Sequence, residues 1–339
     1  MKLADGIHYL KQDMGGHVHA FLLDDGNGIT LIDSLYDSNG KMILDEIRAM
    51  GRQPSDLKNI IATHAHRSHI GGMAELKKLT NATVYAHEWE IDIIEGKRKS
   101  TKVSLWPKAP LAAYKLQFGL AIGFDGHKPC TVDKPLKEAD QVGPLTIVST
   151  PGHTPGCLSF HWPAKKALFV GDVIVTWPRV EAGWAGLTLD MKQNIQSVGK
   201  LSDFGDTEIV GVGHGEPVPE GGIEVLKKLR KACLALPDAE ETVSFRHPTF
   251  RVRGGKTFSV LETYQGELGI CVNVGKRMQG MFLDDPRFFR TPYIGKHGWV
   301  TLRVYAARLN WKEISELVKG SYLLSAPKGR AERAPSSKR

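Results

Sequence analysis

The chain has 339 residues, which is long for one average domain and predicts about two. Hydrophobic residues make up 41% and charged residues 24% of it, which excludes a wholly disordered or fibrous protein. No apolar run approaches the roughly 20 residues that a membrane-spanning helix needs. The N-terminus carries no apolar signal core, and the four cysteines form no CxxC pair. We therefore expect a cytoplasmic protein without membrane contact or a disulfide scaffold.

The net charge of +8 is unevenly distributed along the chain. Residues 1–222 carry 23 Lys and Arg against 26 Asp and Glu, a net charge of −3. Residues 223–339 carry 22 against 11, a net charge of +11. Such a surplus suits an acidic partner such as a nucleic acid. A solvated surface that ends in a disordered basic tail at 329–339 is the plainer explanation, and without a motif it is preferred.

Short apolar strands alternate with helices over the first 222 residues. Several of the strands end on His or Asp, and the pattern predicts two sheets covered by helices. Residues 96–142 are irregular around a helix at 111–124, and predict either a lid or substrate wall or an inert insertion. The other elements are expected as strands at 17–25, 28–35, 57–64, 83–87, 145–151, 157–162, 167–172 and 208–215, and as helices at 41–50 and 71–80.

The remainder of the chain predicts a second, smaller block of structure. It opens with a helical pattern at 223–236 and closes with a helix at 311–320. Four strands are expected between them, at 249–254, 256–264, 267–274 and 299–306. We therefore divide the chain into domains at 1–222 and 223–328, followed by the tail.

Three histidines within six residues give the strongest chemical signal. His64, His66 and His69 follow an apolar strand and lie in the turn into the next helix. Imidazoles at this spacing can converge on one divalent metal ion, whereas a single histidine is usually a core or surface group.

Three more strands end on a residue that can bind a metal. His153 lies in a Pro-Gly-His-Thr-Pro-Gly turn, Asp172 follows Gly171, and His214 lies between two glycines. Glycine allows the backbone to approach closely at such points. Chance placement of all these signals in this order is improbable, so we predict one metal centre.

In these residues and their order, residues 5–222 resemble the metallo-β-lactamase superfamily. The resemblance implies a four-layered αβ/βα sandwich with a metal centre between the sheet edges. It implies a first metal site of His64, His66 and His153, with Asp172 as the bridging carboxylate. It implies a second site of His69 and His214. The cofactor implied is Zn²⁺, one or two ions, with Fe or Mn as alternatives.

One residue departs from the family pattern HxHxDH, because Ser68 stands where the pattern has Asp. A neutral hydroxyl is a poorer zinc ligand than a carboxylate or imidazole. We therefore predict a weakened second site, with a mononuclear or inactive centre as the alternative. Ser68 could still hydrogen-bond a metal-bound water.

The resemblance implies a zinc-dependent hydrolase that acts on a small molecule. A metal-bound hydroxide would attack the carbonyl of an ester, thioester, lactone or β-lactam. Asp172 and Ser68 are the predicted catalytic residues. His19, on one face of the predicted strand 17–25, and Trp177 and Trp184, in the loop after Asp172, are candidates for the substrate pocket, and ordinary packing explains each of them about as well.

Residues 224–328 resemble the MmcQ/YjbR family through several stretches in order, among them HPTFRVR at 247–253 and TPYIGKHGWV at 291–300. The resemblance implies a small α+β domain with one antiparallel sheet. Cations interleaved with aromatic residues suit nucleic-acid contact, although a small domain needs those aromatics in its core, which is the preferred explanation. The alternative function is thus a nucleic-acid-binding protein with a structural or degenerate metal domain, and its candidate contacts are Arg251, Arg253, Lys256 and Lys296. The sequence predicts no oligomeric state.

Overall fold

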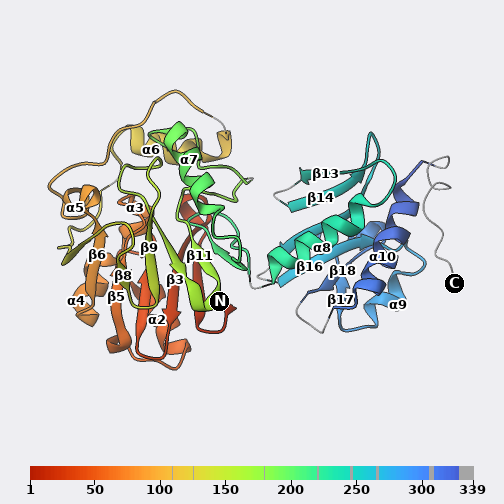
Figure 1. Ribbon diagram of the computed structural model, residues 1–339, viewed down its shortest axis with the longest axis horizontal. Coiled ribbons are helices and arrows are strands. Elements are labelled where there is room, and N and C mark those ends of the chain that lie inside the picture. The colour runs from red at the N-terminus through yellow and green to blue at the C-terminus, as the bar shows by residue number, and fades with distance from the viewer. Residues whose placement is uncertain are drawn as a thin grey trace. The chain divides into compact units, whose positions relative to one another are not determined.

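The computed structural model describes residues 1–108, 110–124, 126–178, 180–219, 221–244, 247–264, 267–304 and 309–327. The chain folds into two compact units, Met1–Glu220 and Gly221–Arg339 (Figure 1). The tail expected at 329–339 lies outside the described residues.

The first unit is built on two sheets. Strands β1 to β7 form one sheet in chain order, antiparallel from β1 to β4 and parallel from β4 to β7. The other sheet has the order β12-β11-β10-β9-β8, with only the β11–β12 pair parallel. The strands are β1 (Lys2–Ala4), β2 (Ile7–Gln12), β3 (Val18–Asp24), β4 (Ile29–Ile32), β5 (Leu57–Ile61), β6 (Thr83–His87), β7 (Lys134–Leu136), β8 (Gln141–Val142), β9 (Leu145–Ser149), β10 (Leu158–Trp162), β11 (Ala167–Phe169) and β12 (Ile209–Gly211).

Helices and short 3₁₀ turns fill the connections. The helices are α1 (Met14–His17), α2 (Lys41–Ala49), α3 (Arg67–Ile70), α4 (Met73–Thr80), α5 (Glu88–Ile94), α6 (Tyr114–Ala121) and α7 (Met191–Leu201). The 3₁₀ turns are η1 (Pro54–Asp56), η2 (Leu111–Ala113) and η3 (Pro163–Lys165).

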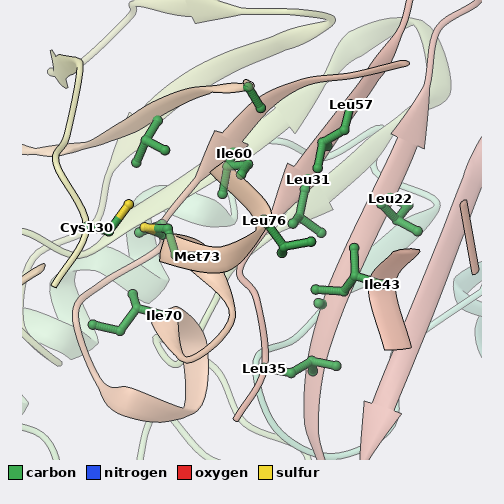
Figure 2. Close-up of a cluster of buried hydrophobic side chains, with 14 of the residues drawn as sticks. Leu22, Leu31, Leu35, Ile43, Leu57, Ile60, Ile70, Met73, Leu76 and Cys130 are labelled. Carbon is green, nitrogen blue, oxygen red and sulfur yellow. The ribbon is translucent and has the colours of Figure 1, made fainter. Parts of the chain in front are cut away.

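Alternate side chains of the buried strands of the first sheet belong to two different apolar clusters. Successive side chains of a strand point to opposite faces of its sheet. Leu22 and Ile60 therefore face the helices, whereas their neighbours Phe21 and Ile61 pack toward the second sheet. On the helix side, Figure 2 shows a continuous apolar cluster from β3, β4, β5, α2 and α4, which includes Leu22, Leu31, Ile43, Leu57, Ile60, Met73 and Leu76.

A third apolar cluster covers the outer face of the second sheet. Val148 and Leu168 point away from the first sheet and pack with Leu201 of α7. The order of layers is thus helices, sheet, sheet, helix, which confirms the predicted αβ/βα sandwich.

The polar strand ends meet at one edge of the sandwich. Asp33 follows β4 and His64 follows β5 in the first sheet. In the second sheet His153 follows β9, Asp172 follows β11 and His214 follows β12. The topology therefore brings residues as distant in sequence as Asp33 and His214 to one place.

The second unit is a six-stranded sheet with helices, as expected for a small α+β domain. Its strand order is β13-β14-β15-β16-β18-β17, with every pair antiparallel. Helices α8 and α10 pack on this sheet in Figure 1, and Leu229 and Tyr322 lie in its core. The elements are α8 (Gly222–Leu234), β13 (Ala239–Ser244), β14 (His247–Val252), β15 (Thr257–Tyr264), β16 (Glu267–Asn273), α9 (Gln279–Leu283), β17 (Phe288–Arg290), η4 (Gly295–His297), β18 (Trp299–Arg303) and α10 (Trp311–Ser325).

Helix α8 directs its apolar stripe into the second unit. Val225, Leu229 and Cys233 recur at helical spacing and are buried there. All four cysteines are buried and free of disulfides. In the described part of the chain, every helix is too short or too polar to cross a bilayer.

Candidate metal centre

Three histidine rings and one carboxylate form the first group of potential ligands. His66 Nδ1 lies 3.0 Å from His64 Nε2 and 3.1 Å from His153 Nε2. Asp172 Oδ2 lies 3.8 Å from His64 Nε2 and 3.5 Å from His153 Nε2. One donor atom from each of the four residues lies within 4.8 Å of all the others.

A second group shares Asp172 with the first. His69 Nε2 and His214 Nε2 lie 3.3 Å apart, and they lie 3.5 Å from Asp172 Oδ1 and 3.3 Å from Oδ2, respectively. This group offers three donors, one fewer than the first. The six ligands that the sequence indicated are thus brought together in two groups around a common carboxylate.

The arrangement fits divalent cations. Nitrogens bound to one tetrahedral zinc ion at 2.0–2.1 Å lie roughly 3.3 Å apart, close to the spacings found here. The buried Asp172 Oδ1 has no hydrogen-bond partner among the described residues, an expensive state for a carboxylate oxygen unless a cation satisfies it. Gly213 keeps this space open, because a Cβ at that position would lie 2.1 Å from Asp172 Oδ1.

The outer nitrogen of each buried ring is held by a second residue. His64 Nδ1 contacts the Thr63 hydroxyl at 3.0 Å, and His153 Nδ1 contacts the Thr188 hydroxyl at 3.3 Å. His214 Nδ1 lies 3.1 Å from the carbonyl oxygen of Gly16. Such contacts fix the orientation of each ring and the nitrogen that faces a metal.

Asp33 is the anchor of His69. Its Oδ2 lies 2.7 Å from His69 Nδ1, and its carboxylate also accepts hydrogen bonds from the backbone N–H and hydroxyl of Thr63. Asp33 therefore links Thr63, the residue before His64, to the ring of His69. Sequence reasoning missed it, although it follows a buried strand in the same way as Asp172.

Burial sets the protonation state of the first group. It lowers the pKa of His64 and His66 well below the usual value, and neighbouring histidines add to the effect. It also lowers the pKa of His153 to about 4. These rings are therefore neutral at neutral pH, and the neutral imidazole is the form that binds metals.

Charge balance is different in the second group. Burial alone would lower the pKa of His69, but the charges of Asp172 and Asp33 outweigh it and raise that pKa to about 10. Burial opposes ionisation of Asp172 as well, yet His214 and His69 hold its pKa well below the usual value. A cation that binds His69 Nε2 therefore has to displace a proton from that ring.

Ser68 lies in the first turn of α3, buried beside the second group. Its hydroxyl lies near the phenol of Tyr36. Burial raises the pKa of Tyr36, so this phenol is protonated at neutral pH and can donate a hydrogen bond. Tyr36 has no motif around it and was missed at the level of sequence.

Glu90 joins two of the ligand loops. This carboxylate of α5 is 1% exposed, accepts a hydrogen bond from the backbone N–H of Ala65 at 3.0 Å, and accepts another from the Thr154 hydroxyl. Ala65 lies between two ligands and Thr154 follows a third. No sequence pattern distinguishes Glu90 from an ordinary helix-surface glutamate.

A cavity of about 260 Å³ opens beside the ligands. Trp184 lines it as the sequence suggested, and its ring lies 4.6 Å from that of His214 between centroids. Helix α6 forms part of the wall, so the irregular segment 96–142 contributes to this cavity. The lining residues are Met14, Tyr36, His66, Arg67, Ser68, Lys115, Leu116, Gly119, Leu120, Phe124, Asp172, Trp184, Leu187 and His214.

Two of the candidate pocket residues lie outside the cavity lining. His19 is fully buried, where its Nδ1 lies 3.3 Å from the carbonyl oxygen of Val212 and its ring packs edge-on to Tyr9. Trp177 packs beside Trp184 and accepts a hydrogen bond from the Trp184 indole through its carbonyl oxygen. The strand predicted at 17–25, which carries His19, begins only at Val18, because residues 14–17 form α1.

The four candidate nucleic-acid contacts do not form one surface cluster. Arg251 and Arg253 lie near Glu240, at 3.8 and 3.5 Å, and Lys256 is in the adjoining turn. Lys296 belongs to η4, which connects the two strands at the other end of the sheet order. The four candidates therefore lie toward opposite ends of the sheet order.

Comparison with known proteins identifies the family of each part of the chain. Residues 13–214 match the family model of the metallo-beta-lactamase superfamily. The chain belongs to this superfamily. Residues 234–324 match the YjbR family model, as expected. The superfamily fold carries a His/Asp cluster for divalent metals, and this chain retains such a cluster.

Relatives of known sequence match part of the chain. The chain is 24% identical over 233 residues to the probable metallo-hydrolase YflN of Bacillus subtilis, a match that covers 63% of this chain and 86% of the relative. It is 29% identical over 157 residues to a hydroxyacylglutathione hydrolase of Bartonella tribocorum, with 46% and 49% covered. The chain thus spans about half the length of that hydrolase.

The chain is also similar to a solved protein structure. A metallo-beta-lactamase family protein of Thermus thermophilus is 19% identical, with a TM-score of 0.47, and the match covers 70% of this chain and 85% of the other.

Proposed function

We propose that the protein is a metal-dependent hydrolase that cleaves an ester, thioester, lactone or β-lactam. One observation carries the proposal: six potential ligands converge beside a small cavity, and Asp172 is the only carboxylate among the described residues that line it. A purely structural metal site is usually closed and four-coordinate, whereas a catalytic site keeps an open face for the substrate. A cavity of about 260 Å³ suits a small molecule.

The donor set indicates how metals would be held. His64, His66, His153 and Asp172 would hold a first ion, and His69, His214 and Asp172 a second. Nitrogen donors with one carboxylate suit zinc, iron and manganese alike, and zinc is the ion that we propose. When bound, such an ion lowers the pKa of water toward 7 and polarises a carbonyl oxygen.

The protein's own residues supply the rest of the chemistry. The Tyr36 phenol, protonated at neutral pH, can donate a hydrogen bond to a substrate oxygen in the cavity. The indole of Trp184 and the side chain of Leu187 provide apolar walls that restrict bulk water. In the net reaction the oxygen of water bonds to the carbonyl carbon, the carbon–oxygen, carbon–sulfur or carbon–nitrogen bond breaks, and the leaving atom takes up a proton.

A thioester is the first substrate class to test. A relative named hydroxyacylglutathione hydrolase is 29% identical to this chain over 157 residues, and its name describes hydrolysis of a hydroxyacylglutathione. The match covers about half of that relative, so esters, lactones and β-lactams stay in the comparison.

The test is hydrolysis of one compound from each class by zinc-loaded protein. We expect turnover of at least one class, and we expect Asp172→Asn to reduce it to the background rate. Asp45→Asn, an exposed carboxylate of α2, is the matched control and should retain full activity. A protein that binds zinc but hydrolyses none of the four classes above background would contradict the proposal.

A further inference from the structure

Two cations border the cavity of the candidate metal centre. Arg67 is the first residue of α3, directly after the ligand His66, and is half-buried. Lys115 lies in the first turn of α6 and is exposed. Both side chains line the cavity, although α3 and α6 are separate elements of the first unit.

Aromatic rings, and no carboxylate of the described chain, hold the Arg67 side chain. Its guanidinium carbon lies 5.8 Å from the ring centroid of Tyr36 and 5.7 Å from that of Phe124. Contacts of this kind orient a guanidinium and leave its N–H donors available, because the ring faces accept no conventional hydrogen bond.

Neither cation forms an ion pair with a described residue. An arginine in a partly apolar concavity loses hydration, and an anion that enters the cavity restores favourable electrostatics. Several other cations of the unit do have acidic partners, for example Lys11 with Glu216 at 2.7 Å, Arg52 with Asp24 at 2.6 Å, and Lys77 with Asp133 at 2.7 Å.

Most of the remaining lining is apolar. Leu116 and Leu120 of α6 contribute to it, together with Phe124, Trp184 and Leu187. A compound that suits this space therefore combines a reactive carbonyl at the ligands, an apolar part, and an anionic group at the cations.

We propose that Arg67 and Lys115 bind a carboxylate of the substrate, so that the enzyme selects small anionic acyl compounds. The inference rests on the proposed hydrolase function and specifies its substrate class. A guanidinium forms two parallel hydrogen bonds with a planar carboxylate. Phosphate shares this chemistry, and the small cavity favours the smaller carboxylate.

The kinetic test compares two esters that differ in charge. Zinc-loaded full-length protein hydrolyses 4-nitrophenyl glutarate, which keeps one free carboxylate, and neutral 4-nitrophenyl hexanoate. Loss of a charge-assisted hydrogen bond costs about 10- to 100-fold. We expect Arg67→Gln to raise KM for the glutarate ester by this factor while KM for the hexanoate ester changes little, and Arg67→Lys to restore part of the loss.

Control variants make the result specific. Lys115→Gln, at an exposed position of α6, should also lower the preference for the glutarate ester. Arg48→Gln removes an exposed arginine of α2, outside the cavity lining, and should leave both KM values unchanged. An equal effect of Arg67→Gln and Lys115→Gln on the two esters would overturn the inference.

Calorimetric binding provides a readout that does not depend on turnover. Glutarate and butyrate are titrated into zinc-loaded protein, and we expect glutarate to bind about tenfold or more tightly than butyrate. This difference should disappear in Arg67→Gln. In the kinetic assay, a lower KM for the 4-nitrophenyl carboxylic ester of 4-phosphonobutyrate than for the glutarate ester would overturn the carboxylate assignment in favour of phosphate. If neither ester is hydrolysed but the glutarate preference depends on Arg67, the hydrolase proposal fails while the anion site stands.

Discussion

At the scale of single residues, position 68 determines how the two groups of ligands differ. The first group offers four donors and the second offers three, because Ser68 contributes a neutral hydroxyl that contacts the phenol of Tyr36. A hydroxyl that remains protonated gives a divalent cation much less stabilisation than a carboxylate. The second group should therefore hold its ion more weakly than the first.

Replacement of Ser68 by aspartate tests this difference. We expect Ser68→Asp to retain a second equivalent of zinc through dialysis that leaves the native protein with one, since the carboxylate completes the second group. Elemental analysis measures the stoichiometry, and Ser68→Ala, which supplies no ligand, is the control. An unchanged zinc content in Ser68→Asp would show that residue 68 does not limit the second site.

The metal ligands were recognisable from the sequence because each lies at a strand end in a distinctive local pattern. Asp33 obeys the same rule as Asp172 but lacks such a pattern, so it was overlooked. Tyr36, Arg67 and Glu90 act through neighbours distant in sequence, and only the packing of the chain reveals their roles.

At the scale of elements, strand and helix periodicity predicted most of the first unit. The amphipathic spacing of Ile43, Leu44 and Ile47 correctly indicated α2. The expected strand at 17–25 was wrong at its start, where His17 ends α1 with φ of 58°. A helix of four residues, two of them glycines, carries no apolar repeat by which it could be detected.

Helix α5 places one ionisable group against the ligand loops. Burial raises the pKa of Glu90 to about 7, from 4.5 in an unfolded chain, although hydrogen bonds from Thr154 and Ala65 act in the opposite direction. Between these two pH values the folded chain binds a proton that the unfolded chain has released. The stability associated with Glu90 is therefore present below pH 4.5 and is lost as pH rises through 7.

Glu90→Gln should remove this pH dependence. The glutamine can accept from the Ala65 N–H and donate to the Thr154 hydroxyl, so it preserves both contacts without a titratable charge. We expect the free energy of unfolding of the native protein to fall relative to the variant by up to about 3 kcal/mol between pH 5 and pH 8. Urea unfolding of both proteins at each pH gives this difference. The contribution of the histidine ligands to the pH dependence cancels, because both proteins contain them. A constant difference would contradict the pKa shift.

At the scale of the whole molecule, the two units divide the chemistry unequally. All six ligands and the cavity belong to the first unit, and α8 contributes its buried face to the second. Each unit has an apolar core of its own, which is the condition for independent folding.

Truncation tests whether the first unit is sufficient for folding, zinc binding and hydrolysis. A chain that ends at Gly221 should fold, retain zinc in the same stoichiometry as the full chain, and hydrolyse the preferred substrate at an unchanged rate. Circular dichroism, elemental analysis and steady-state kinetics on the two proteins make the comparison. Loss of turnover in a truncated chain that still folds and binds zinc would assign part of the activity to the second unit.

The most direct test of the metal-centre account is a titration of chelator-treated, full-length protein with zinc while hydrolysis of the preferred substrate is followed. We expect turnover of the native protein to be absent without metal and to rise with the first equivalent of zinc. We expect turnover of Asp172→Asn to stay at background throughout. Turnover that is equal with and without zinc, or that persists in Asp172→Asn, would contradict the account.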